Sequence, residues 1–275
     1  MFEVFQSEFM RNALLAGLLT SIVCGIIGTL VVVNRIVFIS GGIAHAAYGG
    51  IGLAFYFGIP PLIGAAGFSL LISVIMAAVT LRNKQRADTV IGVLWAVGMA
   101  LGIILIDLTS GYNVDLMSFL FGSILAVPRS DILIMVLVDL CVVTTVWLLY
   151  NSFLAMSFDE EFAKARGVRV GLLYYILLGM IALSVIMLIR VVGLILVIAL
   201  LTIPPFIAEK FCKSLKGMML LSILLNSIFT LIGLWFSYIL NLTSGASIIM
   251  VAATFFFASV LFEYARGIHS QSKPK

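Results

Sequence analysis

The sequence predicts an all-α protein, a polytopic bundle of about nine membrane-spanning helices in one transmembrane domain over residues 1–275. Hydrophobic residues make up 63% of the chain and charged residues only 10%, with a mean hydropathy of +1.25. Soluble domains carry about 25% charged residues. The apolar residues also form long runs, each near the roughly 20 residues that a helix needs to cross a bilayer. In lipid such runs must be helical, because each has to satisfy its own backbone hydrogen bonds.

The expected spans follow the apolar runs. The second run is the least hydrophobic, and the boundary between the sixth and seventh is placed at Arg190. Met1–Arg11 carries two glutamates and precedes a run of full spanning length, so we expect no cleavable signal. In chain order the runs are Ala13–Val33, Val37–Phe57, Pro61–Leu81, Val90–Leu108, Ile132–Tyr150, Leu172–Ile189, Val191–Ile207, Met218–Leu240 and Ser247–Phe262.

The basic residues predict the orientation of the bundle. With these spans, thirteen of the sixteen Lys and Arg residues fall on one side, and only Arg11, Arg129 and Arg190 fall on the other. Because basic residues gather in cytoplasmic loops, we expect a multi-pass protein of the cytoplasmic membrane, with its N-terminus outside and its C-terminus inside. The net charge of +4 therefore gives no indication of nucleic-acid binding.

Two connections are longer than turns. Thr109–Ser130, expected outside, contains VDLMSFLFGSILAV, an apolar run too short to span and more typical of a re-entrant or interfacial segment. Asn151–Gly171, expected inside, contains SFDEEFAKARGVRVG. There Ser157 can cap a short helix with Glu160 three residues later, and Gly167 can end it. A charged, capped helix between two spans has two interpretations of about equal weight: a docking site for a partner, or a solvated loop that happens to be helical.

His45 is the principal candidate for a functional residue within a span. Gly41, Gly49 and Gly52 share its helix face, and Gly42 follows Gly41. Such a glycine stripe either permits close helix packing or lines a cavity into which the imidazole projects. Neutral imidazole is a good ligand for zinc, manganese or ferrous iron. The alternative is a histidine that hydrogen-bonds a carbonyl or a carboxylate on a neighbouring helix.

The remaining chemistry-bearing residues are sparse. Asp139 is the clearest carboxylate within a span, where a charge costs about 2.5–3.5 kcal/mol, and Asp115 is expected near the outer surface. The three cysteines are isolated, and the sequence has no HxxxH, CxxC, GxxxxGK[ST], GxSxG or HExxH motif. It therefore offers no complete metal site, no phosphate-binding loop for ATP hydrolysis and no hydrolase signature.

Long segments resemble the ABC-3 family, the membrane permease subunits of ATP-binding-cassette importers for manganese, zinc and iron. The order and spacing of four segments carry the resemblance. They are FMRNALLAGLLTSIVCGIIGTLVVVNR at Phe9–Arg35, ISGGIAHAAYGGIGLAFYFG at Ile39–Gly58, GYNVDLMSFLFGSILAV at Gly111–Val127 and FAKARGVRVGLLYYILLGMIALSVIMLIRVVGLILVIALLTIPPFIA at Phe162–Ala208.

The resemblance implies a transporter rather than an enzyme, with a divalent metal ion as cargo and no permanently bound cofactor. A separate cytoplasmic ATP-binding subunit would drive transport, and an extracytoplasmic metal-binding protein would deliver the ion. The permease would pair in the lipid bilayer as a homodimer or with a second permease. The ATP-binding subunit would dock on a coupling segment at about residues 157–169, which includes Ser157, Glu160, Glu161 and Gly167.

The resemblance also implies that His45 lines the translocation path. Many family members carry an aspartate one helical turn earlier, where this chain has Gly41. The oxygen ligand would then come from Asp139 or Asp115, or the site would combine two copies of His45, and the cavity-lining glycines would be Gly41, Gly42, Gly49 and Gly52. Two alternatives stay open. One is a permease for a metal chelate, siderophore or cobalamin-like cargo, and the other is a passive or proton-coupled carrier.

Overall fold

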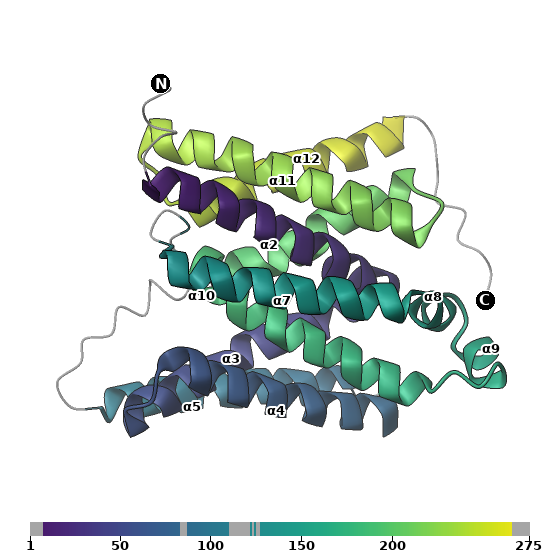
Figure 1. Ribbon diagram of the computed structural model, residues 1–275, viewed down its shortest axis with the longest axis horizontal. Coiled ribbons are helices and arrows are strands. Elements are labelled where there is room, and N and C mark those ends of the chain that lie inside the picture. Colours follow the sequence, from purple (N-terminus) through teal and green to yellow (C-terminus); the bar gives the residue numbers. More distant parts are fainter. Residues whose placement is uncertain (1–7, 83–86, 110–121, 123, 125–126, 266–275) are drawn as a thin grey trace.

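The computed structural model describes residues 8–82, 87–109, 122, 124 and 127–265, with the backbone alone at residues 190, 191, 194, 195 and 265. Over these residues it is a bundle of helices without a strand, which confirms the predicted all-α class (Figure 1). The helices are α2 (Glu8–Val33), α3 (Val37–Phe57), α4 (Pro61–Arg82), α5 (Ala87–Asp107), α7 (Arg129–Leu148), α8 (Tyr150–Phe158), α9 (Glu160–Ala165), α10 (Val170–Phe211), α11 (Leu215–Leu240) and α12 (Ser244–Ala265).

The longest helix, α10, contains two spanning segments. At Gly193 the backbone leaves the helical region, with φ 78° and ψ 163°, a conformation that glycine adopts readily. In Figure 1 the chain runs along α10 from the α9 end of the bundle, reverses, and returns to that end before α11 begins. Eight described segments are long and apolar enough to cross a membrane, Val170–Ile189 among them, and residues 194–211 add the returning segment. The structure thus agrees with about nine spans, but the reversal occurs at Gly193 and not at Arg190.

The other boundaries differ mainly at polar helix starts. The helix over Val37–Phe57 has both ends where the sequence predicted them. In contrast, α2 begins at Glu8 instead of Ala13, and α7 begins at Arg129 instead of Ile132. These extra turns are polar, so they fall outside an apolar run although they are helical. An exposed salt bridge joins the two starts, with Arg129 Nε 2.7 Å from Glu8 Oε1.

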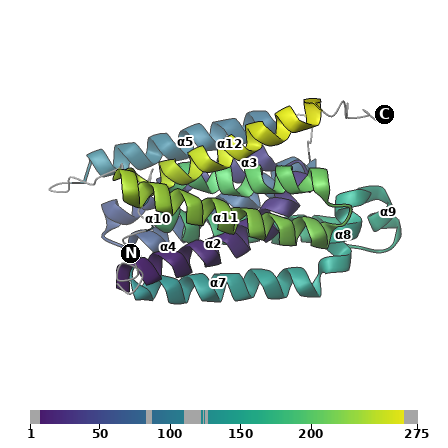
Figure 2. The ribbon, with the colours of Figure 1, turned by 90° about the horizontal axis from the view of Figure 1, so that it is seen from above.

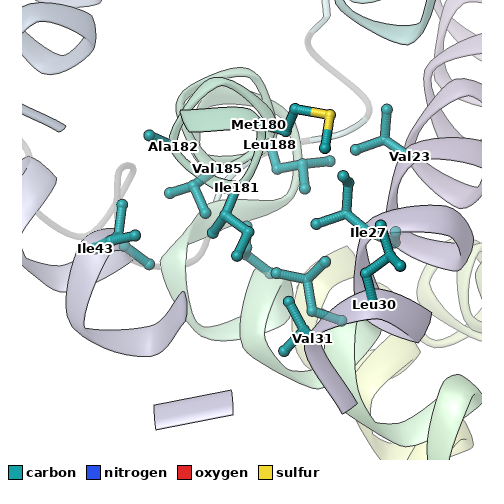
Figure 3. Close-up of a cluster of buried hydrophobic side chains, with 14 of the residues drawn as sticks. Val23, Ile27, Leu30, Val31, Ile43, Met180, Ile181, Ala182, Val185 and Leu188 are labelled. Atoms are coloured by element: carbon teal, nitrogen blue, oxygen red, sulfur yellow. The ribbon is translucent and has the colours of Figure 1, made fainter. Parts of the chain in front are cut away.

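The bundle has an inner and an outer set of helices. Side chains of α2, α3 and the first half of α10 make up most of the core, and Figure 3 shows Val23 and Ile27 of α2 facing Ile181 and Leu188 of α10. The helices α4, α5, α7 and α12 keep most of their apolar side chains on the surface. In a bilayer this outer set supplies the surface that contacts lipid or another subunit.

The two ends of the bundle differ in charge. The N-terminal start of α2 lies at one end, and α8, α9 and the end of α12 lie at the other (Figures 1 and 2). Described basic residues at the first end are Arg11 and Arg129. Those at the second end are Arg35, Arg82, Lys164, Arg166, Arg169, Lys210, Lys213 and Lys216. The asymmetry has the form that the sequence predicted from an odd number of spans.

The long connection expected over Thr109–Ser130 falls mostly outside the described residues, and Asp115 lies outside them too. Its described end packs on the bundle: Ile124 and Val127 are buried, and the side-chain amide of Asn12 donates a hydrogen bond to the Val127 carbonyl at 3.2 Å. This contact fixes the start of α7 against α2.

Candidate functional site

His45 occupies a singular position on α3. Over residues 39–52 it is the one side chain that is not buried, since α4, α5 and α10 cover the rest of the helix. Its Nδ1 atom is itself buried and has no hydrogen-bond partner among the described residues. The imidazole is therefore held inside the bundle, yet part of it remains accessible and one nitrogen lacks a partner.

The imidazole stacks on a tryptophan that itself contacts a phenylalanine and a methionine. The His45 ring stacks on the indole of Trp95 in α5, with centroids 4.0 Å apart and planes at 10°. The indole Nε1 donates to the sulfur of Met99 at 3.2 Å, and Phe38 lies 5.9 Å from the Trp95 centroid. These contacts restrict the ring plane of His45, as aromatic stacking generally does.

Three of the four glycines predicted to line a cavity serve helix packing instead. A Cβ added at Gly52 would meet the backbone of Gly102 at 2.5 Å, and one at Gly49 would meet the carbonyl oxygen of Gly98 at 2.9 Å. A Cβ at Gly42 would meet Ile91 of the same helix, α5, at 2.5 Å. Small residues let helix backbones approach this closely. The glycine stripe therefore explains why α5, and with it Trp95, lies against α3.

Gly41 differs from the other three. A Cβ added there would meet only the Ile198 side chain, at the ordinary van der Waals distance of 3.6 Å. The position one turn before His45 thus has room for a larger side chain, and close packing does not require glycine there.

Of the two predicted acids, Asp139 does not join His45, and Asp115 lies outside the described residues. Asp139 lies on α7, which packs on α2 and not on α3, and its side chain is 6% exposed near Cys24. Neither carboxylate oxygen has a hydrogen-bond partner among the described residues. Within the described part of the chain, no three His, Cys, Asp or Glu side chains are close enough to hold a metal ion. The described residues therefore hold no complete cluster of protein ligands around His45.

The predicted coupling segment forms a corner built from α8 and α9. The N-cap of α9 is Asp159, whose carboxylate accepts from the Phe162 N–H at 2.9 Å, and not Ser157 as the sequence predicted. Ser157 lies in α8, and its hydroxyl instead accepts from the Asn34 side-chain amide at 2.9 Å. The difference arises because α8 continues to Phe158, which leaves Asp159 as the first residue with a free side-chain oxygen at the start of α9.

Gly167 terminates the helix α9, as the sequence predicted. Gly167 has φ +79°, its N–H donates to the Lys164 carbonyl at 2.9 Å, and the Val168 N–H donates to the Ala163 carbonyl at 3.0 Å. This is the Schellman pattern of helix termination. Lys164 Nζ bridges Glu160 at 3.0 Å and Glu161 at 3.1 Å, and hydrogen bonds to these two carboxylates raise the pKa of Lys164.

The sequence pattern predicted neither the contact of Trp95 with His45 nor Asp159 as the N-cap of α9. A tryptophan in the middle of an apolar helix was a usable signal for Trp95, because tryptophans of membrane proteins are enriched at the interfaces. For Asp159 the signal was present but ambiguous, since serine and aspartate both cap helices well.

The chain is similar to known proteins along nearly its whole length. The model of the ABC 3 transport family matches residues 6–263. An uncharacterized membrane protein of Synechocystis sp. is 50% identical over 262 residues, which cover 95% of this chain and 93% of that protein. The manganese transport system membrane protein MntC of Listeria monocytogenes is 34% identical over 265 residues, with 96% and 94% covered. The solved structure of PsaBC from Streptococcus pneumoniae in complex with Fab matches with a TM-score of 0.84 at 33% identity, over 94% of this chain and 93% of that one.

Proposed function

The chain belongs to the ABC 3 transport family, and from this premise we propose that it is the membrane permease subunit of an importer whose cargo is manganese. The manganese transport protein MntC is similar to it over 96% of the chain, which supports this cargo over zinc or iron. The chain itself is not an enzyme under this proposal, because ATP hydrolysis belongs to a separate subunit.

The observation that carries the proposal is the placement of His45. A neutral imidazole coordinates divalent transition metals, and here it is the one side chain over residues 39–52 of α3, the most enclosed helix, that is not buried. Transport needs a site that binds weakly enough to release its ion. One imidazole per protomer, completed by water or by a second copy of His45, satisfies that need.

The orientation and the partners follow from the two ends of the bundle. The basic end, with α8 and α9, is cytoplasmic by the positive-inside rule, which places the start of α2 outside. The corner of α8 and α9, with Ser157, Glu160, Glu161 and Gly167, then receives the ATP-binding subunit. A metal-binding protein would deliver the ion at the opposite end, and a second permease copy would complete the path. Closure of the ATP-binding subunits would switch the packing of the bundle between inward-open and outward-open arrangements.

The proposal is tested by total cellular manganese, iron and zinc, measured by elemental mass spectrometry in cells that express the wild-type chain, the His45→Ala variant or the His269→Ala variant. We expect His45→Ala to abolish accumulation of manganese while the transporter still assembles. His269→Ala removes the chain's other histidine and should accumulate manganese like the wild type. Unchanged manganese in His45→Ala would overturn the role of His45. A wild-type chain that changes no metal would overturn the cargo.

A further inference from the structure

A cavity of about 250 Å³ lies at the end of the bundle that carries α8 and α9. Its walls come from the link between α2 and α3 and from α3, α4, α5, α8, α9 and α10. The polar lining residues are Asn34, Arg35, Thr80, Asp88, Glu160 and Tyr174. The cavity therefore gathers two acids, one base, one amide and two hydroxyls from five separate parts of the chain.

The size and lining of the cavity suit a hydrated divalent cation. Six waters around an octahedral ion occupy about 180 Å³, at roughly 30 Å³ for each water. The hydroxyl oxygens of Thr80 and Tyr174 are buried and face each other in the cavity wall. A hydroxyl has one donor and two acceptor lone pairs, so each keeps hydrogen-bonding capacity for water or for the hydration shell of an ion.

Two aromatic side chains lie between the cavity and His45. Phe38 lines the cavity and lies 5.9 Å from the Trp95 ring, and Trp95 stacks on His45 at 4.0 Å. An ion that leaves His45 toward the cytoplasm would meet this aromatic pair first and the cavity behind it.

The first turn of α9 contributes a carboxylate to the cavity wall. Glu160 lines the cavity and its side chain is 30% exposed, whereas the neighbouring Glu161 is 86% exposed and lies outside the lining. Both carboxylates bind Lys164 at nearly equal distances, 3.0 and 3.1 Å. The two residues thus share a helix, a partner and a charge, and they differ in access to the cavity.

We propose that this cavity is a cytoplasmic exit site for the hydrated divalent cation, with Glu160 as its main carboxylate. The proposal rests on the proposed transport function and adds a second site to it. Since Glu160 belongs to the segment proposed to receive the ATP-binding subunit, a displacement of α9 moves a wall of the exit site directly. Movement of the ATP-binding subunit would then change the affinity of the exit site without a long relay through the bundle.

The test uses a cysteine as a reporter inside the cavity of the assembled transporter. Thr80→Cys is introduced together with Cys141→Ser and Cys212→Ser, which leaves the buried Cys24 as the remaining native thiol. Labelling by a charged, water-soluble maleimide is followed with and without Mn²⁺. At ten times its dissociation constant, Mn²⁺ should slow the labelling about tenfold. Leu81→Cys, also in the cavity lining, serves as the reporter if Thr80→Cys does not assemble.

The two glutamates supply the matched comparison. Glu160→Gln should abolish the protection by Mn²⁺, and Glu161→Gln should keep it. Equal loss in both variants would mean that the surface charge of α9, and not the cavity, attracts the ion, and no protection in the parent reporter would rule out an exit site. The labelling does not depend on import. A transporter that fails to accumulate manganese but shows Glu160-dependent protection would therefore refute the proposed cargo and leave the exit site standing.

Discussion

The imidazole of His45 lies flat on the indole of Trp95, with 4.0 Å between the ring centroids and 10° between the planes. The indole is held in turn by its hydrogen bond to the sulfur of Met99. The stack limits rotation of the imidazole and so sets the direction of its nitrogen lone pair. A neighbouring group that orients a metal ligand commonly changes metal affinity. Trp95 is thus a positioning residue for the proposed path.

Trp95→Ala should weaken manganese uptake about 2- to 10-fold, because an aromatic pair contributes about 0.5–1.5 kcal/mol beyond its buried area. The loss should appear as a higher half-saturation concentration in initial uptake rates. Trp95→Phe keeps an aromatic face against His45 and should recover most of the affinity. Identical half-saturation in the alanine variant would show that the stack does not orient the ligand.

Gly41→Asp should make the metal site at His45 bind more tightly. The position lies one turn before His45 and has room, since an added Cβ would meet only Ile198 at 3.6 Å. A carboxylate there would add the hard oxygen ligand that manganese favours. We expect a lower half-saturation concentration for manganese together with a lower maximal rate, because a tighter site releases its ion more slowly. Gly41→Asn matches the size without the charge, and the same kinetics in both variants would contradict a direct contact with the ion.

The ends of a helix could be predicted from the sequence where the apolar run and a local terminating residue coincide. Both ends of α3 match the prediction, since Gly58 closes this helix in a left-handed conformation with φ 68°. The reversal in α10 was predicted at Arg190, because a charged residue interrupts the apolar run there. It occurs at Gly193 instead, because the backbone reverses where a residue can adopt positive φ.

The surroundings of His45 could be predicted only in part. The sequence left open whether the glycine stripe beside His45 packs against a helix or lines a cavity, and in the structure Gly42, Gly49 and Gly52 pack against α5. The sequence could not indicate which helix packs on the stripe. That depends on the approach of Gly52 to Gly102, which are fifty residues apart in the sequence and meet only in the folded bundle. Trp95 is carried to His45 by that approach, so its role becomes visible in the fold alone.

Gly52→Ala should destabilise the protein by about 1–3 kcal/mol, the usual cost of an overpacked core. The added Cβ would meet Gly102 backbone atoms at 2.5 and 2.6 Å and would force α3 away from α5. Gly41→Ala is the matched control on the same helix, since it has space and gains helix propensity. Thermal unfolding in detergent should separate the two variants, with Gly52→Ala lower. Equal midpoints would show that the contact between α3 and α5 can relax at no cost.

Asp139→Asn should transport manganese near the wild-type rate, although the sequence named Asp139 as a candidate ligand. The carboxylate lies between α7 and α2, and α7 does not pack on the helix of His45. Asparagine keeps its size and removes its charge. Initial uptake rates alongside His45→Ala decide the matter, because a comparable loss in an assembled Asp139→Asn transporter would place Asp139 on the path after all.

Gly167→Val should uncouple ATP hydrolysis from transport. Gly167 has φ +79°, where a residue with a Cβ costs about 1–2 kcal/mol and a β-branched one is especially disfavoured. The strain should open the bonds from Gly167 to Lys164 and from Val168 to Ala163, and so fray the end of α9. No other atoms lie within 4 Å of an added Cβ, so backbone strain is the only local effect of the change.

Gly167→Asn, which tolerates this conformation, should stay coupled. The measured quantity is manganese imported for each ATP hydrolysed in proteoliposomes. A valine variant with the wild-type ratio would show that the ATP-binding subunit does not use the end of α9.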